Sequence, residues 1–113
     1  MDAEQSSVIA YDGPEPLRRP IAQALGRVVD PELSLSITDV GLVYGVEVDE
    51  HRVHVALTMT SAACPVADVI VDEVETELDA VLPPSMRIEV ELVWEPPWTS
   101  ERMSDRAREF MGW

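Results

Sequence analysis

The sequence predicts an α+β fold: a two-layer domain with the element order α-β-β-α-β and a short final helix. Three observations support this. The chain has 113 residues, the length of one domain. Two segments repeat apolar residues at helical spacing, whereas three segments alternate apolar and polar residues. A strand, a helix and a strand follow in series, which favours a parallel pair with a right-handed crossover. We therefore expect a three-stranded mixed sheet with the helices on one face.

The first helix follows a polar beginning of the chain. Residues 1–15 contain acidic residues, two serines, a glycine and a proline, and are expected to form a flexible leader. The domain is therefore predicted to span residues 16–113. Apolar residues at helical spacing then predict the first helix: Leu17, Ile21, Leu25 and Val28. This helix is expected to end at Asp30-Pro31, because a residue before proline is pushed out of the helical region. An acidic loop of about ten residues follows, with room for a short extended piece.

Two strands come next, over residues 42–48 and 53–60, and the short segment 49–52 makes them an antiparallel hairpin. One face of the second strand is apolar: Val53, Val55, Leu57 and Met59. A second helix is expected after Cys64-Pro65, with an apolar stripe at Val66, Ile70, Val74, Leu78 and Val81. A third strand covers residues 87–94. Thr99 or Ser100 is a candidate cap for the last helix, and Gly112 is its expected end.

Composition excludes several functions. The chain has 22 acidic residues against 8 basic ones, all arginine, and a formal charge of -14. Phosphate backbones and anionic lipids would repel it, so we expect no nucleic-acid and no membrane partner. No apolar run approaches the roughly 20 residues of a membrane span. The N-terminus does not resemble a secretory signal, so a cytoplasmic location is expected. The single cysteine excludes an intrachain disulfide framework.

That cysteine, Cys64, is the most informative residue. Pro65 suits the first position of a helix, which makes Cys64 the expected N-cap. The positive end of the helix dipole would lower the pKa of the thiol, and the thiolate is both the nucleophile and a soft metal ligand. The alternative is a small buried apolar side chain.

Other candidates are acidic or aromatic. Asp30, Glu32 and Asp39 lie in the predicted loop, and a loop folded back toward Cys64 would offer them as metal ligands or acid–base groups. Alternatively they end the first helix and cap a turn. The two histidines are expected to be plain surface residues. Trp94 and Trp98 flank a proline pair and are expected to form a packed corner; a partner anchor is the alternative.

Four short motifs in order carry a family resemblance: Val29-Asp30-Pro31-Glu32, Asp39-Val40-Gly41-Leu42-Val43-Tyr44, Leu57 through Cys64-Pro65, and Val93-Trp94-Glu95-Pro96-Pro97-Trp98-Thr99. Together they resemble the small iron–sulfur cluster assembly and maturation proteins that include SufT and PaaD. The resemblance implies an iron–sulfur cluster assembly-like domain. It also implies that Cys64 is the functional thiol, in a pocket with Asp30, Glu32, Asp39, Thr60 and Pro65.

The hypothesis is an auxiliary maturation factor, more a helper than an enzyme. In it, Cys64 is a transient ligand to iron or a cluster, and no cofactor is tightly bound. Common clusters need four ligands, so client or assembly proteins, or a homodimer, must supply the others. Two alternatives remain. One is a thiol-dependent enzyme with Cys64 as nucleophile. The other is a pure protein adaptor, for example for an oxygenase or phenylacetate-type pathway complex.

Overall fold

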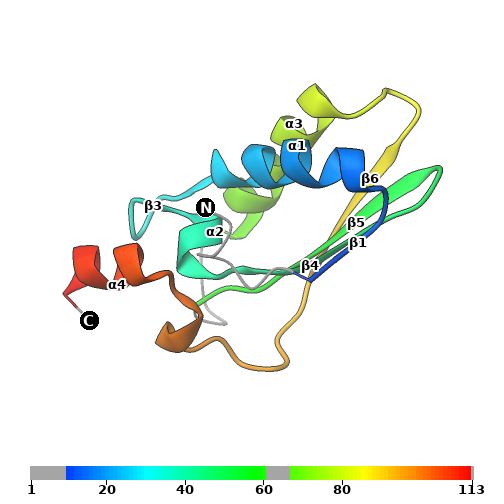
Figure 1. Cartoon of the computed structure of the whole chain (residues 1–113). Helices are drawn as coiled ribbons and strands as arrows, with labels where there is room; N and C mark the ends of the chain where they lie inside the picture. The colour runs from blue at the N-terminus through cyan, green and yellow to red at the C-terminus, as the bar shows by residue number, and fades with distance from the viewer. Residues whose placement is uncertain (1–9, 61–66, 113) are drawn as a thin grey trace.

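The computed structural model describes residues 10–60 and 67–112 (Figure 1). Its elements follow one another as β1 (Ala10–Asp12), α1 (Glu15–Gly26), β2 (Val29–Asp30), β3 (Leu35–Ser36), α2 (Ile37–Val40), β4 (Val43–Val48), β5 (Arg52–Leu57), α3 (Ala67–Val81), β6 (Arg87–Leu92), the 3-10 turn η2 (Ser100–Arg102) and α4 (Asp105–Met111). The predicted α+β class and the order of its main elements are confirmed.

The main sheet has the strand order β1-β4-β5-β6. Strands β4 and β5 form the predicted antiparallel hairpin, and β5 and β6 form the predicted parallel pair around α3. The prediction of three strands is wrong by one, because β1 pairs parallel with β4 at the opposite edge. This strand lies in the segment assigned to a leader. Its three residues are too few to show the alternation by which a strand is recognised.

The two long helices cover one face of the sheet, as predicted. Helices α1 and α3 lie side by side above the strands in Figure 1. The core between the layers contains fully buried side chains from α1, the central strand β5 and α3: Ile21, Leu25, Val53, Val55, Leu57, Ile70, Val74 and Leu78. Burying a side chain of this size contributes about 1.5–3 kcal/mol relative to exposure. The helical and alternating patterns of the sequence therefore mark the two sides of one core.

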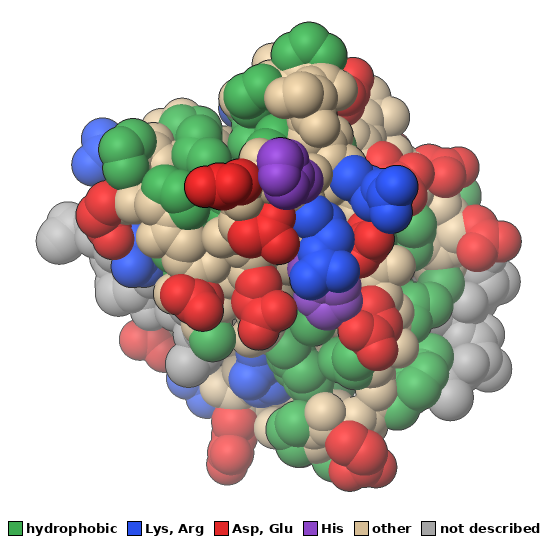
Figure 2. All heavy atoms as spheres, turned by 90° about the vertical axis from the view of Figure 1, so that its right-hand side faces the viewer, with side chains coloured by type: hydrophobic (Ala, Val, Ile, Leu, Met, Phe, Trp, Pro, Cys, Tyr) green, Lys and Arg blue, Asp and Glu red, His purple; other side chains and the backbone are tan. Residues whose placement is uncertain are grey.

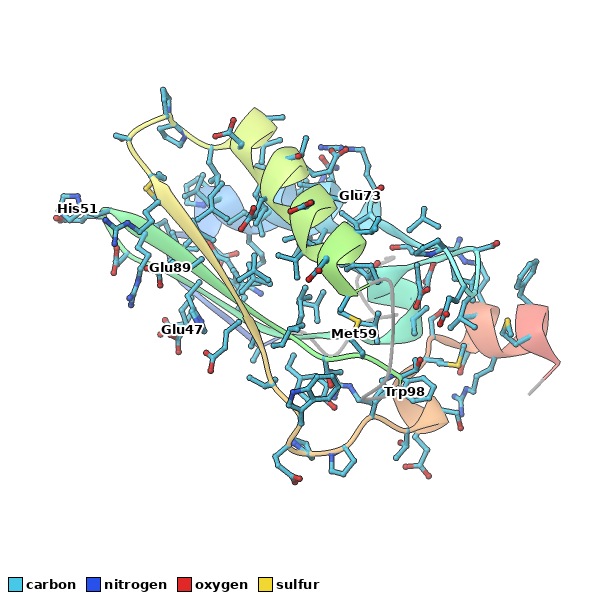
Figure 3. The ribbon with its side chains drawn as sticks, turned by 180° about the vertical axis from the view of Figure 1, so that it is seen from behind. Glu47, His51, Met59, Glu73, Glu89 and Trp98 are labelled. Carbon is cyan, nitrogen blue, oxygen red and sulfur yellow. The ribbon has the colours of Figure 1, made fainter. Side chains whose placement is uncertain are left out.

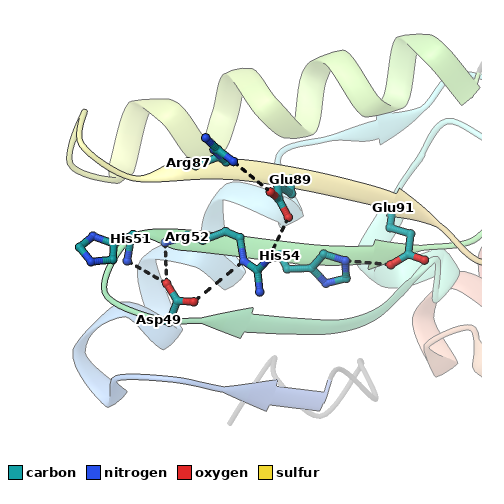
Figure 4. A network of polar contacts seen from close by, with 7 residues as sticks. All are labelled: Asp49, His51, Arg52, His54, Arg87, Glu89 and Glu91. Carbon is teal, nitrogen blue, oxygen red and sulfur yellow. Dashed lines mark hydrogen bonds and ion pairs between the residues drawn. The ribbon is translucent and has the colours of Figure 1, made fainter.

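The opposite face of the sheet is charged. His54 Nε2 lies 2.9 Å from Glu91 Oε1, and Arg52 Nη1 lies 3.4 Å from Glu89 Oε1 (Figure 4). Figure 2, which looks toward the end of the sheet formed by the β4–β5 hairpin, shows acidic and basic side chains gathered there with the histidines. This face is left open by the helices, so the sheet keeps polar residues there.

The segment predicted as an acidic loop is more ordered than expected. Strands β2 and β3 pair antiparallel, and the helical turn α2 follows directly. Ser36 caps α2, since its hydroxyl accepts from the Thr38 N–H at 3.2 Å. Gly41 ends α2 with a φ of 85°, a conformation that L side chains rarely adopt.

The last helix begins later than predicted. Ser104, not Thr99 or Ser100, is the cap of α4, because its hydroxyl accepts from the Ala107 N–H at 3.0 Å. Thr99 instead precedes the separate turn η2. Gly112 ends α4 with a φ of 76°, as predicted. Within the described residues, no helix has the length and apolar character needed to cross a membrane.

Candidate functional site

Cys64 and Pro65 lie outside the described residues, but the elements on either side of them are defined. Strand β5 ends at Leu57, and the buried Met59 (Figure 3) and the half-buried Thr60 follow it. Helix α3 begins at Ala67. The cysteine therefore belongs to a short connection between a central strand and a core helix, the position in the chain order that the sequence predicts.

Asp30 is buried and engaged in a local turn. Its side chain is 2% exposed, and its Oδ1 accepts from the Glu32 N–H at 2.9 Å. Its carbonyl oxygen accepts from the N–H groups of Leu33 and Ser34, at 3.2 and 2.7 Å. A short acidic side chain that bonds to its own backbone two residues on is typical of turns. Glu32, by contrast, is exposed.

Asp39 is also buried, and it holds the C-terminal part of the chain. The hydroxyl of Ser104 donates to Asp39 Oδ1 at 3.0 Å, and Arg106 Nη2 donates to Oδ2 at 3.0 Å. The Ser104 N–H also donates to the Asp39 carbonyl oxygen at 2.8 Å. Both carboxylate oxygens are thus bonded within the fold, which is the role of a structural anchor.

The C-terminal segment, defined as residues 93–112, closes over the region from α2 to β4. The Trp98 Nε1–H donates to the Val40 carbonyl at 2.8 Å. Arg102 donates to the Gly41 carbonyl at 3.0 Å and to the Val43 carbonyl at 3.3 Å. The Val40 and Gly41 carbonyls lie at the end of α2 and have no partner within the helix, whereas Val43 begins β4. Trp98 packs against the core as the sequence analysis expected, but Trp94 is 43% exposed, so the predicted packed corner is formed by Trp98 and not by both tryptophans.

Tyr44 joins the same arrangement from β4. The Arg102 guanidinium carbon lies 4.0 Å from the centre of the Tyr44 ring, within cation–π distance. The Tyr44 hydroxyl donates to the Pro96 carbonyl at 2.6 Å. Sequence reasoning missed Arg102, Ser104 and Arg106. A serine before an acidic residue at the start of α4 is an N-cap signal for Ser104, whereas no sequence pattern distinguishes the two arginines.

The candidate segments are brought together by backbone bonds. The Ile37 N–H donates to the Val28 carbonyl at 2.9 Å, which joins the segments of Asp39 and Asp30. The Thr58 N–H donates to the Leu42 carbonyl at 2.8 Å, which joins the end of β5 to the residues after α2. The structure does not gather their carboxylates: among the residues it describes, no three acidic, histidine or cysteine side chains form a group able to hold a metal ion.

These features define a class: a small α+β domain with helices on one face of a mixed sheet and a cysteine-bearing connection between β5 and α3. The chain belongs to the iron–sulfur cluster assembly protein family, whose model matches residues 18–92. The family resemblance found in the sequence is confirmed.

Relatives and a solved structure agree with this assignment. The chain is 48% identical over 99 residues to the Fe-S protein maturation auxiliary factor YitW of Bacillus subtilis, covering 87% of this chain and 96% of the relative. It is 45% identical over 86 residues to the Fe-S protein maturation auxiliary factor SufT of Staphylococcus aureus, covering 75% and 97%. The crystal structure of the domain of unknown function DUF59 from Bacillus anthracis superposes with a TM-score of 0.81 at 41% identity, covering 87% and 93%.

Proposed function

We propose that this protein is an auxiliary factor in the maturation of iron–sulfur proteins. The observation that carries the proposal is the 48% identity to YitW, which extends over nearly the full length of both chains. An alignment of this length extends over the three strands β4, β5 and β6, helix α3 and the connection that contains Cys64. The partners are then iron–sulfur client or assembly proteins. The proposed location is the cytoplasm, and the role is that of a helper rather than an enzyme.

The working atom in this proposal is the Cys64 sulfur. Its thiolate is a transient ligand to iron or to a cluster, because soft thiolates are the ligands that iron–sulfur centres prefer. A single chain supplies one such ligand, and a common cluster takes four. The remaining ligands come from a client, an assembly protein or a second copy of the chain. No tightly bound cofactor is required.

The acidic candidates divide into two kinds. Asp30 and Asp39 hold the backbone around the site, since both are buried and hydrogen-bonded within the chain. Glu32 is exposed and is the carboxylate proposed to meet iron or a client. Thr60 and Pro65 complete the proposed pocket on the side of the cysteine-bearing connection.

The test is complementation of cells that lack the gene. Wild type, Cys64→Ser and Cys64→Ala are expressed to equal levels, and the activity of a cluster-dependent client enzyme is measured relative to its protein level. Both variants are expected to lose the stimulation of client activity, because neither side chain supplies a thiolate. Urea unfolding of the purified variants provides the control for folding. Full complementation by Cys64→Ser would overturn the thiolate mechanism.

Dependence on iron distinguishes the maturation role from the thiol-enzyme alternative, which needs none. Alkylation of Cys64 is followed across pH with and without ferrous iron. Protection by iron supports the maturation role, whereas a fast thiolate that turns over a small substrate without iron supports the enzyme. The adaptor alternative proposed Trp98 as an exposed anchor for a partner. The half-buried Trp98 indole, bonded to the Val40 carbonyl, does not favour this role.

A further inference from the structure

An open hollow lies between the C-terminal end of α1 and the side of α3. Its lining consists of Arg27, Val29, Asp72, Glu73, Thr76 and Glu77. The one basic residue of this lining, Arg27, is already paired: its Nε lies 2.8 Å from Glu77 Oε1. Within the described part of the chain, Asp72 and Glu73 form no ion pair. The hollow therefore carries uncompensated negative charge.

Exposed apolar side chains accompany this charge. Val29, in the lining, is 45% exposed, and Val69 on α3 is 47% exposed. Val69 stands three, four and seven positions before Asp72, Glu73 and Thr76, so all four share one side of the helix. Figure 3 labels Glu73 on this helix. The lining together with Val69, named here the docking hollow, combines two apolar contacts with free carboxylates.

We propose that the docking hollow binds a basic amphipathic segment of a partner protein. Apolar residues of that segment contact Val29 and Val69, while its lysines or arginines face Asp72 and Glu73. Such charge complementarity accelerates association and selects the partner. A second copy of this chain does not fit, because the formal charge is -14 and α3 carries six acidic residues and no basic one. Like charges brought together across an interface oppose binding.

This surface goes beyond the proposed function, since it needs no iron ligation by Cys64. Its position still relates to that function. Helix α3 begins three residues after Cys64, so a partner held on α3 is held by the element that follows the thiol in the chain.

The test uses the full chain and a fluorescent synthetic helix peptide of leucine and lysine, with a leucine–glutamate peptide as a negative probe. The double variant Asp72→Asn/Glu73→Gln is expected to weaken binding of the lysine peptide about fivefold, as two lost exposed charge pairs imply. The matched control is Glu75→Gln/Asp79→Asn, which removes the same charge from the same helix. Glu75 and Asp79 lie outside the lining, so this control is expected to change the affinity less than about twofold.

A second variant tests the apolar contacts. Val69→Ser is expected to weaken binding, whereas Phe110→Ser, on the exposed Phe110 of α4, is not. Amide chemical shifts on peptide addition should change most at Arg27, Val29 and the first turns of α3. Equal weakening by the two charge variants, or shifts spread over the whole acidic surface, would overturn the docking hollow. Cys64→Ser should bind the peptide as wild type does, which separates this outcome from that of the maturation proposal.

Discussion

Asp39 and Ser104 bond to each other twice, although 65 positions separate them in the chain. The Ser104 N–H donates to the Asp39 carbonyl oxygen at 2.8 Å, and the Ser104 hydroxyl donates to Asp39 Oδ1 at 3.0 Å. The same hydroxyl accepts from the Ala107 N–H and so caps α4. One serine thus begins the last helix and fixes it to the residue expected to be a pocket carboxylate.

Asp39→Ala is expected to lower the free energy of unfolding by about 2–3 kcal/mol, because a buried hydroxyl and a guanidinium lose their acceptor. Ser104→Ala should cost about 1–2 kcal/mol through the lost cap and hydrogen bond. Arg106→Ala should cost less than about 1 kcal/mol, since the arginine side chain is 82% exposed. Urea unfolding measures all three. Unchanged stability of Asp39→Ala with lost client activity would contradict the anchor role.

Two glycines with similar backbone angles provide a matched pair. Gly41 and Gly112 have φ values of 85° and 76°. A Cβ at Gly41 would meet the Arg102 carbonyl oxygen and would lie 2.7 Å from Arg102 Cβ, whereas a Cβ at Gly112 meets nothing within 4 Å. Gly112→Ala should cost about 1–2 kcal/mol from backbone strain alone. Gly41→Ala should cost clearly more in the same unfolding measurement, and equal losses would contradict the close packing of Arg102.

Tyr44 makes two separable contacts. Tyr44→Phe removes the bond to the Pro96 carbonyl but keeps the ring under Arg102, and should cost about 0.5–1.5 kcal/mol. Tyr44→Leu removes both and should cost at least about 0.5 kcal/mol more. A double-mutant cycle with Arg102→Met isolates the ring–guanidinium contribution. A coupling energy near zero between Tyr44→Leu and Arg102→Met would show that the ring does not stabilise the arginine.

The hairpin turn predicts a pH effect. The His51 N–H donates to Asp49 Oδ1 at 2.8 Å, and the Arg52 N–H does the same. These backbone bonds, that of His51 first, lower the pKa of the Asp49 carboxyl below its ordinary value. The carboxylate therefore stabilises the turn above the ordinary aspartate pKa, and this stabilisation is lost as the pH falls through the lowered value. A carbon-detected NMR titration should place the Asp49 midpoint below that of an unstructured aspartate, and a midpoint at or above it would contradict the turn.

Glu32 and Asp30 allow a separation of folding from function. Glu32→Gln should leave the free energy of unfolding within about 0.5 kcal/mol, because Glu32 is exposed. Asp30→Ala should cost about 1–3 kcal/mol, because it removes the buried acceptor of the Glu32 N–H. Complementation of the gene deletion measures function. Full client activity with Glu32→Gln would remove this residue from the proposed site.

Patterns repeated over many residues made most of the fold predictable. The spacing of Ile70, Val74 and Leu78 predicts α3 because a helix returns to the same side every three to four residues. The alternation of Val53, Val55 and Leu57 predicts β5 for the equivalent reason. Strand β1 and the turn α2 were not predicted because segments of three or four residues are too short to show a repeat of apolar residues. The late start of α4 was not predicted because Thr99, Ser100 and Ser104 all have side chains that can cap a helix. The contacts with Asp39 favour Ser104 as the cap.

The site was predictable only in part. The motif around Asp39 and Gly41 could be recognised, but its bonds come from residues more than 50 positions away. The residues around an arginine on a polar segment, such as Arg102, do not indicate which distant carbonyl groups it will bind. The sequence alternatives for Asp30 also became distinguishable only when the backbone around it closed into a turn.

The C-terminal segment has a consequence for how the protein is made. The Val40 and Gly41 carbonyls are synthesised 58 and 61 residues before the Trp98 and Arg102 groups that bond to them. Contacts between such distant residues form late in folding, because a long loop must close first. On the ribosome, α2 and the start of β4 therefore lack these partners until Trp98 and Arg102 have emerged. The domain is therefore completed only after Trp98 and Arg102 have left the ribosome, and a chain truncated before them lacks the groups that finish it.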